Sequence, residues 1–505
     1  MIFLADDMGF SDAGCYGGEI HTPNIDKLAA QGIRFTDFHN TARCWPSRAA
    51  LLTGYYAQQV RRDTIPGVDF RTGAAGIRPA WAKLLPAMLN PLGYRSYHSG
   101  KWHIDGPRLK AGFDHSYSIE DHNRHFYPKL TLEDDVKLPP VQPDSGYFSA
   151  TAIADHAIKY LKEHAEEHHE QPFFLYVAFI SPHFPIQAPA EDIAKYKGRY
   201  DAGWDEMRVE RWKRMKELGI IDCDLSPRDP KTIPAWNAPE AELKKQIGPQ
   251  EVGYAVAWDS LTPEQKAFQS IKMSIHAAMV DRMDQEIGRV MTQVREMGAG
   301  DDTLVLFMSD NGASAEQIIR GDGNDPTAAP GSGKSFLCLG PGWSTFCNTP
   351  MRLHKSWVHE GGISTPLVVS WPKGIAAHGE LRRNPGHLID IAPTILELAG
   401  GTWPTAWGKD KVPPPPGKSL VPVFTKDDSV SHDYFWWFHE GHKALRVGDY
   451  KAVSLGDDAP WELYNLHTDR SEMNDLAAKD PARTKELSVL WEQKMSEFRK
   501  LASKD

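Results

Sequence analysis

The chain has 505 residues, 41% of them hydrophobic and 25% charged, which is the composition of a globular protein with a large core and about two domains. Its formal net charge of −10, without any basic stretch, argues against a general nucleic-acid binder. No apolar stretch reaches the length of a transmembrane helix, and the cysteines at 15, 44, 223, 338 and 347 follow no zinc-binding pattern, although Cys338 and Cys347 could pair.

The first predicted element is a buried strand over residues 2–5, an apolar run that ends in two carboxylates, Asp6 and Asp7. Met1 leads directly into this strand, and no signal peptide is visible. We therefore expect either that a leader and a few strand residues belong before Met1, or that the start has been assigned too late. The location of the protein in the cell does not follow directly from such a start.

Strands and helices alternate along most of the chain. The apolar pattern predicts further strands at residues 34–39, 94–98, 173–180, 303–308 and 367–371. Helices are predicted at residues 25–31, after Cys44 through 52, and at 152–164, 271–294 and 389–398. Such alternation favours a mostly parallel sheet covered by helices on both faces.

The chain divides into three predicted segments. Residues 1–400 form an α/β domain, in which the polar residues 190–265, with a helix near 205–218, are expected to cross the surface rather than join the core. Residues 401–425 are proline-rich and predict a linker or rigid loop. Residues 426–505 predict a small α+β domain with a hairpin at 443–454, a strand at 461–466 and a terminal helix from Pro481.

Polar residues follow directly after four of the predicted strands. In open α/β sheets, binding sites gather beyond the carboxyl ends of the strands, so these residues can converge in space although they are scattered in the sequence. They are Asp6 and Asp7, Lys101 and His103, His183, and Asp310 with Asn311.

Residues 44–54 read C-W-P-S-R-A-A-L-L-T-G. A cysteine near an arginine is by itself usually a small apolar residue, here just outside a helix that starts near Pro46. This stretch, however, resembles the signature of the type I formylglycine-dependent sulfatases, a bacterial arylsulfatase-like family of the alkaline-phosphatase-like superfamily, and the likeness extends over nearly the whole chain. The resemblance implies a large mixed, mostly parallel sheet between helices, followed by a small four-stranded sheet with a helix.

The resemblance also implies a modified residue 44. In the family, a formylglycine-generating (maturating) enzyme reads C-x-P/A-x-R and oxidises the cysteine to 3-oxoalanine, or formylglycine, an aldehyde that hydrates to a gem-diol and attacks sulfur. Arg48 lies four residues after Cys44, on the same side of a helix, where it can hold the hydrate and offset its charge. Unmodified Cys44 would not perform the same cycle.

Three carboxylates and one amide oxygen are candidate ligands for a hard divalent cation. Taken separately, Asp6 and Asp7 also suit a strand-end turn, and Asp310 with Asn311 suits a plain turn. The patterns D-D-x-G-x-x-D at residues 6–12 and S-D-N-G at 309–312 resemble the sulfatase metal-binding motifs. The resemblance implies one Ca²⁺, with Mg²⁺ as the alternative, held by Asp6, Asp7, Asp310, Asn311 and residue 44 as formylglycine.

Four further residues match family positions. Lys101 and His103 stand in G-K-W-H; the resemblance implies that Lys101 holds formylglycine and sulfate, and that His103 takes a proton from the diol so that sulfate is released. His183, in P-H-F-P, and Lys355, five residues before E-G-G, would bind sulfate and protonate the leaving oxygen. His122 is a weaker candidate for a sulfate contact, whereas His359, His387 and Asp390 are interpreted as structural.

The predicted function is hydrolysis of sulfate monoesters, aryl sulfates and sulfated carbohydrates, by a sulfuric-ester hydrolase of the EC 3.1.6 type. The alternatives are a phosphonate monoester or phosphodiester hydrolase on the same fold, or a non-catalytic glycan-binding relative. The predicted partners are a small-molecule or saccharide sulfate ester and the maturating enzyme, with no nucleic acid and no membrane span. The resemblance implies a periplasmic or extracellular location, while the lack of a visible signal peptide leaves the cytoplasm open.

Overall fold

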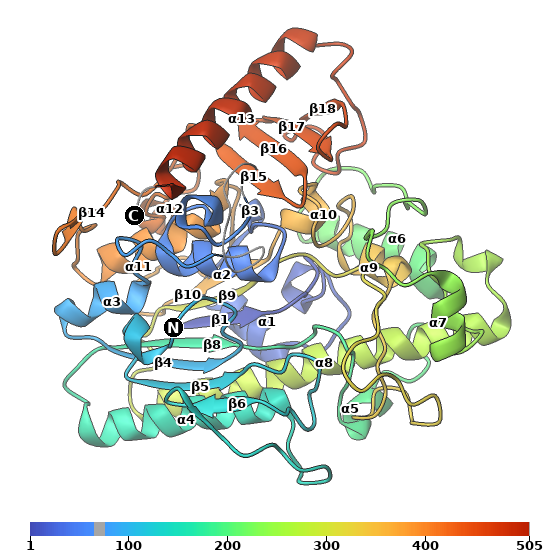
Figure 1. Ribbon diagram of the computed structural model, residues 1–505, viewed down its shortest axis with the longest axis horizontal. Helices are drawn as coiled ribbons and strands as arrows, with labels where there is room; N and C mark the ends of the chain where they lie inside the picture. The colour runs from blue at the N-terminus through green and yellow to red at the C-terminus, as the bar shows by residue number, and fades with distance from the viewer. Residues whose placement is uncertain (65–75, 504–505) are drawn as a thin grey trace.

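The computed structural model describes residues 1–64 and 76–503 (Figure 1). Its centre is a ten-stranded sheet with the order β11-β2-β10-β9-β1-β8-β4-β5-β6-β7. In chain order these strands are β1 (Ile2–Ala5), β2 (Ile33–Phe35), β4 (Arg95–Gly100), β5 (His115–Ile119), β6 (Thr131–Glu133), β7 (Val136–Lys137), β8 (Phe173–Ala178), β9 (Val305–Ser309), β10 (Leu367–Ser370) and β11 (Glu380–Arg382).

The middle of the sheet is parallel. Strands β9, β1, β8, β4 and β5 run in one direction, whereas β10 is antiparallel to both β9 and β2. The fold is thus the large mixed, mostly parallel sheet that the resemblance implied. Because the five central strands share a direction, their carboxyl ends all open on one edge.

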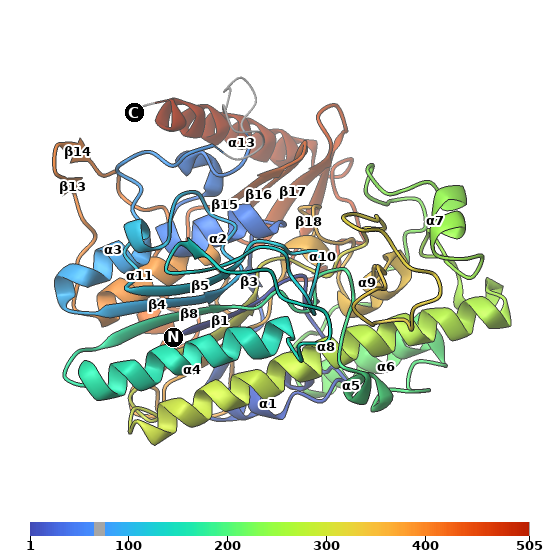
Figure 2. The ribbon, with the colours of Figure 1, turned by 60° about the horizontal axis from the view of Figure 1, so that its bottom comes forward.

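Helices cover both faces, and the alternation of side chains along β1 decides which cluster each residue joins. Phe3 packs into the core shared with α1 (Pro23–Ala30), α4 (Ser149–Glu167) and α8 (Pro263–Glu296), whereas Ile2 and Leu4 pack into the core shared with α2 (Cys44–Thr53), α3 (Leu85–Leu89) and α11 (Ile391–Leu398). Figure 2 shows α4 and α8 side by side across the first face. Both faces of the sheet are therefore buried.

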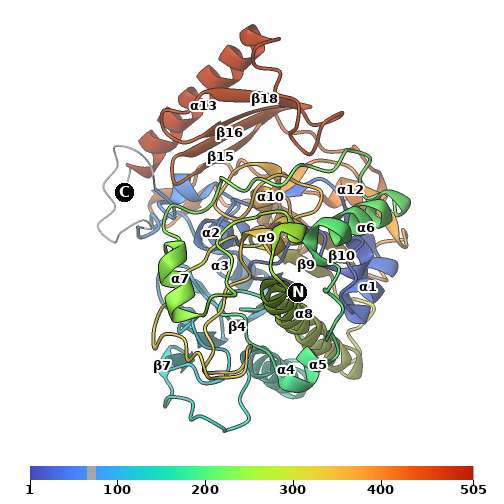
Figure 3. The same cartoon turned by 90° about the vertical axis from the view of Figure 1, so that its right-hand side faces the viewer.

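The C-terminal part is a four-stranded antiparallel sheet with one long helix, as predicted. Its strands are β15 (Phe435–His439), β16 (His442–Val447), β17 (Tyr450–Leu455) and β18 (Trp461–Asn465), and its helix is α13 (Pro481–Ala502), whose N-cap Asp480 accepts from the backbone N–H of Arg483. Figure 3 shows the sheet and α13 stacked on the rest of the molecule. Trp436 and Trp491 belong to the same hydrophobic cluster as α2, so the two parts share one core.

Three expectations need correction. Residues 34–39 are not one strand: β3 (Phe38–His39) leaves the main sheet and pairs with β12 (Gly386–His387). The segment 190–265 holds α5 (Ala190–Ala194), α6 (Gly203–Glu217) and α7 (Glu240–Gln246), and it joins the core, since Trp204 and Trp258 are buried in the cluster that contains Phe3. The proline-rich segment is packed as well, with a β13–β14 hairpin (Ala406–Trp407, Asp410–Lys411) and α12 (Val421–Thr425), whose Val423 is fully buried.

All five cysteines are free, so Cys338 and Cys347 do not form a bridge. Within residues 1–64 and 76–503, the structure contains no helix with the length and apolar character that crossing a bilayer requires.

Candidate active site

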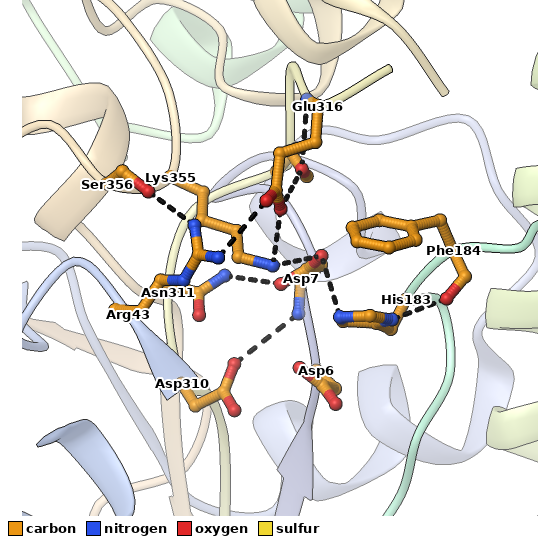
Figure 4. Close-up of polar contacts among 12 residues, drawn as sticks. Asp6, Asp7, Arg43, His183, Phe184, Asp310, Asn311, Glu316, Lys355 and Ser356 are labelled. Carbon is orange, nitrogen blue, oxygen red and sulfur yellow. Dashed lines mark hydrogen bonds and ion pairs between the residues drawn. The ribbon is translucent and has the colours of Figure 1, made fainter. Parts of the chain in front are cut away.

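Two neighbouring parallel strands bring the predicted carboxylates together. Ala5 of β1 is in register with Ser309 of β9, so the residues that follow these strands, Asp6–Asp7 and Asp310–Asn311, leave the sheet side by side. Asn311 Nδ2 donates to Asp7 Oδ1 at 2.7 Å, and the backbone N–H of Asp7 donates to Asp310 Oδ1 at 3.4 Å (Figure 4). Asp7 has a positive φ of 66°, a left-handed conformation that aspartate tolerates better than most residues.

The donor set fits a hard divalent cation. Asp6, Asp7 and Asp310 are at most 3% exposed. Asp6 Oδ1 and Asn311 Oδ1 are buried oxygens without a hydrogen-bond partner among residues 1–64 and 76–503. Such orphaned acceptors are costly unless another group satisfies them. Burial and the neighbouring charge of Asp6 raise the pKa of Asp310, because crowded carboxylates repel one another. Carboxylate and amide oxygens are the ligands that Ca²⁺ and Mg²⁺ prefer.

Cys44 is the first residue of α2 and is only 3% exposed. Burial raises the pKa of its thiol, and Asp6 and Asp310 raise it further, while Lys101 and Lys355 act in the opposite direction. The unmodified thiol is therefore a poor nucleophile at neutral pH. Its electrostatic neighbours are nevertheless the groups that the sequence analysis singled out, so the structure gathers them around residue 44.

Arg48, one turn further along α2, is fully buried and points at the carboxylates. Its Nη2 lies 2.8 Å and its Nε 2.9 Å from Asp310 Oδ2, and its Nη1 donates to the backbone carbonyl of Lys101 at 2.8 Å. The hydrogen bonds from Nε to Asp310 and from Nη1 to the Lys101 carbonyl fix the guanidinium in one orientation. Arg48 thereby joins the helix that begins at residue 44 to the ends of β9 and β4.

Lys101 and His103 follow β4. Lys101 Nζ lies 2.5 Å from Asp6 Oδ2. Burial alone would raise the pKa of Asp6, but Lys101, His183 and Arg48 hold it well below its usual range. The ring of His103 packs edge-on against Trp45 and His122, with ring centres 5.7 and 5.2 Å apart. Its buried Nδ1 has no hydrogen-bond partner in the part of the chain that the structure describes. Burial, together with Lys101 and His122, keeps the pKa of His103 well below its usual value.

His183 and Lys355 meet at Asp7 from two different segments (Figure 4). His183 Nε2 is 3.9 Å from Asp7 Oδ2, and its Nδ1 is 2.5 Å from the carbonyl oxygen of Phe184. Because a carbonyl only accepts, Nδ1 carries the proton in the neutral ring and Nε2 is left bare. Lys355 Nζ lies 2.8 Å from the same Asp7 oxygen, and Asp7 with Glu316 raises the pKa of Lys355 against the effect of burial.

The structure thus brings every sequence-predicted site residue to one edge of the sheet, and His122 lies next to His103. It adds Arg43, Trp236 and Glu316, for which no motif gave a signal. Asp12, the last aspartate of the D-D-x-G-x-x-D pattern, belongs elsewhere: it pairs with Arg211 at 2.8 Å and with His276 at 3.0 Å.

The chain is similar to known proteins over almost its whole length. A family model described as Sulfatase matches residues 1–401, and one described as N-sulphoglucosamine sulphohydrolase, C-terminal, matches residues 352–501. The chain is 33% identical to an uncharacterised sulfatase of Schizosaccharomyces pombe, over 97% of this chain and 92% of that protein. It is 31% identical to an arylsulfatase of Klebsiella aerogenes, over 84% and 91%. The crystal structure of Ps i-CgsB with k-i-k-neocarrahexaose superposes with a TM-score of 0.68 at 22% identity, covering 99% of this chain and 93% of that one.

Proposed function

Because the chain belongs to the sulfatase family of sulfuric-ester hydrolases, we propose that the buried cluster around residue 44 is its active site. The observation that carries this proposal is the convergence of two lysines, a histidine and three carboxylates from separate segments near the start of α2. A sulfatase-like protein in which these side chains lay far apart would share the fold but could not hydrolyse sulfate esters at this place.

Residue 44 works as formylglycine in this proposal. When hydrated, the aldehyde supplies an oxygen nucleophile that a buried thiol with a raised pKa does not supply. Since Cys44 is only 3% exposed in the folded chain, the maturating enzyme must reach it before the fold closes. The unpartnered Nδ1 of His103 would accept a proton from the hydrate.

The metal ligands we propose are Asp6, Asp7, Asp310 and Asn311, with residue 44 completing the set. Ca²⁺ is the ion we favour over Mg²⁺, since the set is rich in carboxylates and includes an amide oxygen. When bound, the ion would supply positive charge beside the sulfate oxygens and the attacking oxygen. The two buried, partnerless oxygens, Asp6 Oδ1 and Asn311 Oδ1, support the placement.

The charges of the site suit an anionic ester. Three carboxylates are paired with three cationic side chains, namely Asp6 with Lys101, Asp7 with Lys355 and Asp310 with Arg48. A divalent ion therefore leaves a surplus of positive charge, which attracts a sulfate monoester. Lys101 and Lys355 would hold the sulfate oxygens. Lys355, and His183 once its Nε2 has taken up a proton, would protonate the leaving oxygen.

The substrates we propose are aryl sulfates and sulfated carbohydrates, following the arylsulfatase and the sulphoglucosamine enzyme family to which the chain is similar. We also propose a periplasmic or extracellular site of action, which cell fractionation tests.

The test combines two measurements on one preparation. Mass spectrometry of the tryptic peptide that contains residue 44 reports whether the thiol has become an aldehyde. Release of sulfate from 4-nitrophenyl sulfate and from a panel of sulfated monosaccharides is then measured beside the matching phosphate esters. We expect aldehyde and sulfate release. Much faster hydrolysis of the phosphate esters would instead indicate a phosphohydrolase. If protein verified to carry the aldehyde hydrolysed none of the esters, a glycan-binding protein would be indicated.

A further inference from the structure

Glu316 is a buried carboxylate that four donors share. Its Oε2 lies 3.0 Å from Lys355 Nζ and accepts from Ser314 Oγ at 3.1 Å; its Oε1 accepts from Arg43 Nη2 at 3.1 Å and from Trp236 Nε1 at 2.8 Å. Glu316 is 1% exposed, and although burial would raise its pKa, Lys355 and Arg43 hold the pKa well below its usual range. The side chain is therefore a fixed anion whose oxygens are fully used.

Lys355 depends on this carboxylate for its position. Its ammonium lies between two oxygens, Asp7 Oδ2 at 2.8 Å and Glu316 Oε2 at 3.0 Å, which Figure 4 shows on different sides of Nζ. A lysine side chain is long and flexible, so one partner would not define where its charge sits. If the charge of Glu316 were removed, only Asp7 of these two anionic partners would remain, and the ammonium would shift toward Asp7.

Arg43, directly before residue 44, is the second group that Glu316 holds. Its Nη1 donates to Ser356 Oγ at 2.6 Å. Its guanidinium lies over the indole rings of Trp45 and Trp236, 5.2 and 5.3 Å from their centres. Its Nε is buried and has no hydrogen-bond partner among the residues that the structure describes. Glu316 therefore joins the N-terminus of α2 to the segment that carries Lys355.

Trp236 connects this carboxylate to the periphery. It belongs to the segment 190–265, and residues beside it run along the chain around Glu316: the backbone N–H of Gln317 donates to Asn237 Oδ1 at 2.9 Å, and that of Ala238 donates to the Gln317 carbonyl at 2.9 Å. Trp236 is 38% exposed, so part of the residue remains at the surface while its indole N–H donates to the buried Glu316.

We propose that Glu316 is a positioning residue for sulfate-ester hydrolysis, which fixes Lys355 and Arg43 at adjoining places beside residue 44, and that Trp236 fixes Glu316. The inference rests on the proposed active site. It assigns to the segment 190–265 a part in the reaction, because that segment supplies the indole N–H that orients the carboxylate.

The test compares Glu316→Gln, Glu316→Asp and Trp236→Phe on two aryl sulfates with leaving groups of different acidity, 4-nitrophenyl and phenyl sulfate. A misplaced Lys355 harms a poor leaving group more, since that group needs more help from protonation. We expect kcat of E316Q to fall on both esters, with the loss on phenyl sulfate about 10-fold larger. E316D keeps the carboxylate, so its extra loss of kcat on phenyl sulfate should be much smaller than that of E316Q. W236F should also lose more kcat on phenyl sulfate than on 4-nitrophenyl sulfate, but by less than E316Q.

Glu472→Gln is the matched control. Glu472 is also a buried carboxylate that pairs with a lysine, Lys451 at 2.8 Å, but it lies in the C-terminal part. The E472Q substitution should lower the melting temperature without changing the ratio of the kcat values on 4-nitrophenyl and phenyl sulfate. Each preparation is checked for conversion of residue 44. If wild-type protein with the aldehyde is inactive, the proposed function fails. If wild type is active and both E316Q and W236F keep the wild-type ratio, the positioning role is wrong; should E316Q not fold, W236F decides.

Discussion

Lys101 Nζ lies 2.5 Å from Asp6 Oδ2, with both side chains at most 1% exposed. A buried pair of this kind is costly to assemble, and removal of one partner leaves an uncompensated charge. The other oxygen of Asp6 has no hydrogen-bond partner in the described part of the chain, so Lys101 holds the carboxylate without saturating it. The pair therefore leaves Asp6 available to a metal ion.

Replacement of Lys101 by Ala should lower kcat for an aryl sulfate by about 100-fold or more, because the sulfate loses a cationic contact in a water-poor site. Lys159→Ala is the control: Lys159 forms an ion pair with Glu133 at 2.6 Å, but its side chain is 58% exposed, and such surface pairs contribute little. If the K101A enzyme carried formylglycine and kept the wild-type kcat, the assignment of Lys101 to the active site would be wrong.

Removal of the metal should abolish sulfate release and lower the melting temperature. Ligand binding to the folded state at about 100 times Kd adds about 2.7 kcal/mol, so Ca²⁺ should restore the lost stability to chelated protein. Asn311→Ala, which deletes the unpartnered Oδ1, should weaken this response, whereas Asn474→Ala at the surface should not. The melting temperatures are measured by calorimetry with and without Ca²⁺. If Ca²⁺ raised the melting temperatures of wild type and N311A by the same amount, Asn311 would not be a metal ligand.

The sequence could predict the residues after β1, β4, β8 and β9 because their position depends on a local pattern. An apolar run marks a buried strand, and the polar residues that follow it lie at its carboxyl end whatever the order of strands in the sheet. The motif around Cys44 added the chemistry that spacing alone does not define. This is why Asp6, Lys101, His183 and Asp310 converge as expected.

Other features depend on contacts between distant segments and left no local signal. Glu316 and Trp236 are 80 residues apart in the sequence, with α7, α8 and β9 between them, yet their side chains are hydrogen-bonded. Likewise, residues 34–39 alternate like one strand, yet Asp37 turns away to pair with Arg446, 409 residues later, and the strand is interrupted there. The segment 190–265 looked peripheral because its many charges outnumber the few large aromatic residues that it buries.

The shared core predicts that the C-terminal sheet is not an independent unit. Trp491 is 2% exposed, stacks on Trp436 with ring centres 5.4 Å apart, and donates from Nε1 to the Trp437 carbonyl at 2.9 Å. Trp491→Ala should therefore cost about 3–5 kcal/mol of unfolding free energy, while Val489→Ala on the exposed face of α13 should cost little. Urea unfolding followed by fluorescence and by loss of activity should give one coincident transition. Activity that persists after the C-terminal sheet has unfolded would contradict a common core.

Asp37 makes the stability of the interface between the two parts depend on pH. Arg446 Nη1 and Nη2 donate to its two oxygens at 3.0 and 2.9 Å. Burial would raise the pKa of Asp37, but Arg446, Arg470 and His39 lower it from 3.8 to about 2. Because the folded-state pKa is depressed, the stabilisation is complete above the unfolded-state value near 4 and is lost as the pH falls toward 2, an effect of about 2 kcal/mol.

Asp37→Asn should accordingly be less stable than wild type at pH 7, with a difference that shrinks as the pH is lowered from 5 to 3. Asp428→Asn, at an exposed position nearby, should follow the wild-type curve throughout. Urea midpoints measured at each pH supply the comparison. If D37N and wild type differed by the same amount at pH 3 as at pH 7, the Asp37 carboxylate would contribute through its shape rather than its charge, and the ion pair with Arg446 would not be the source of acid sensitivity.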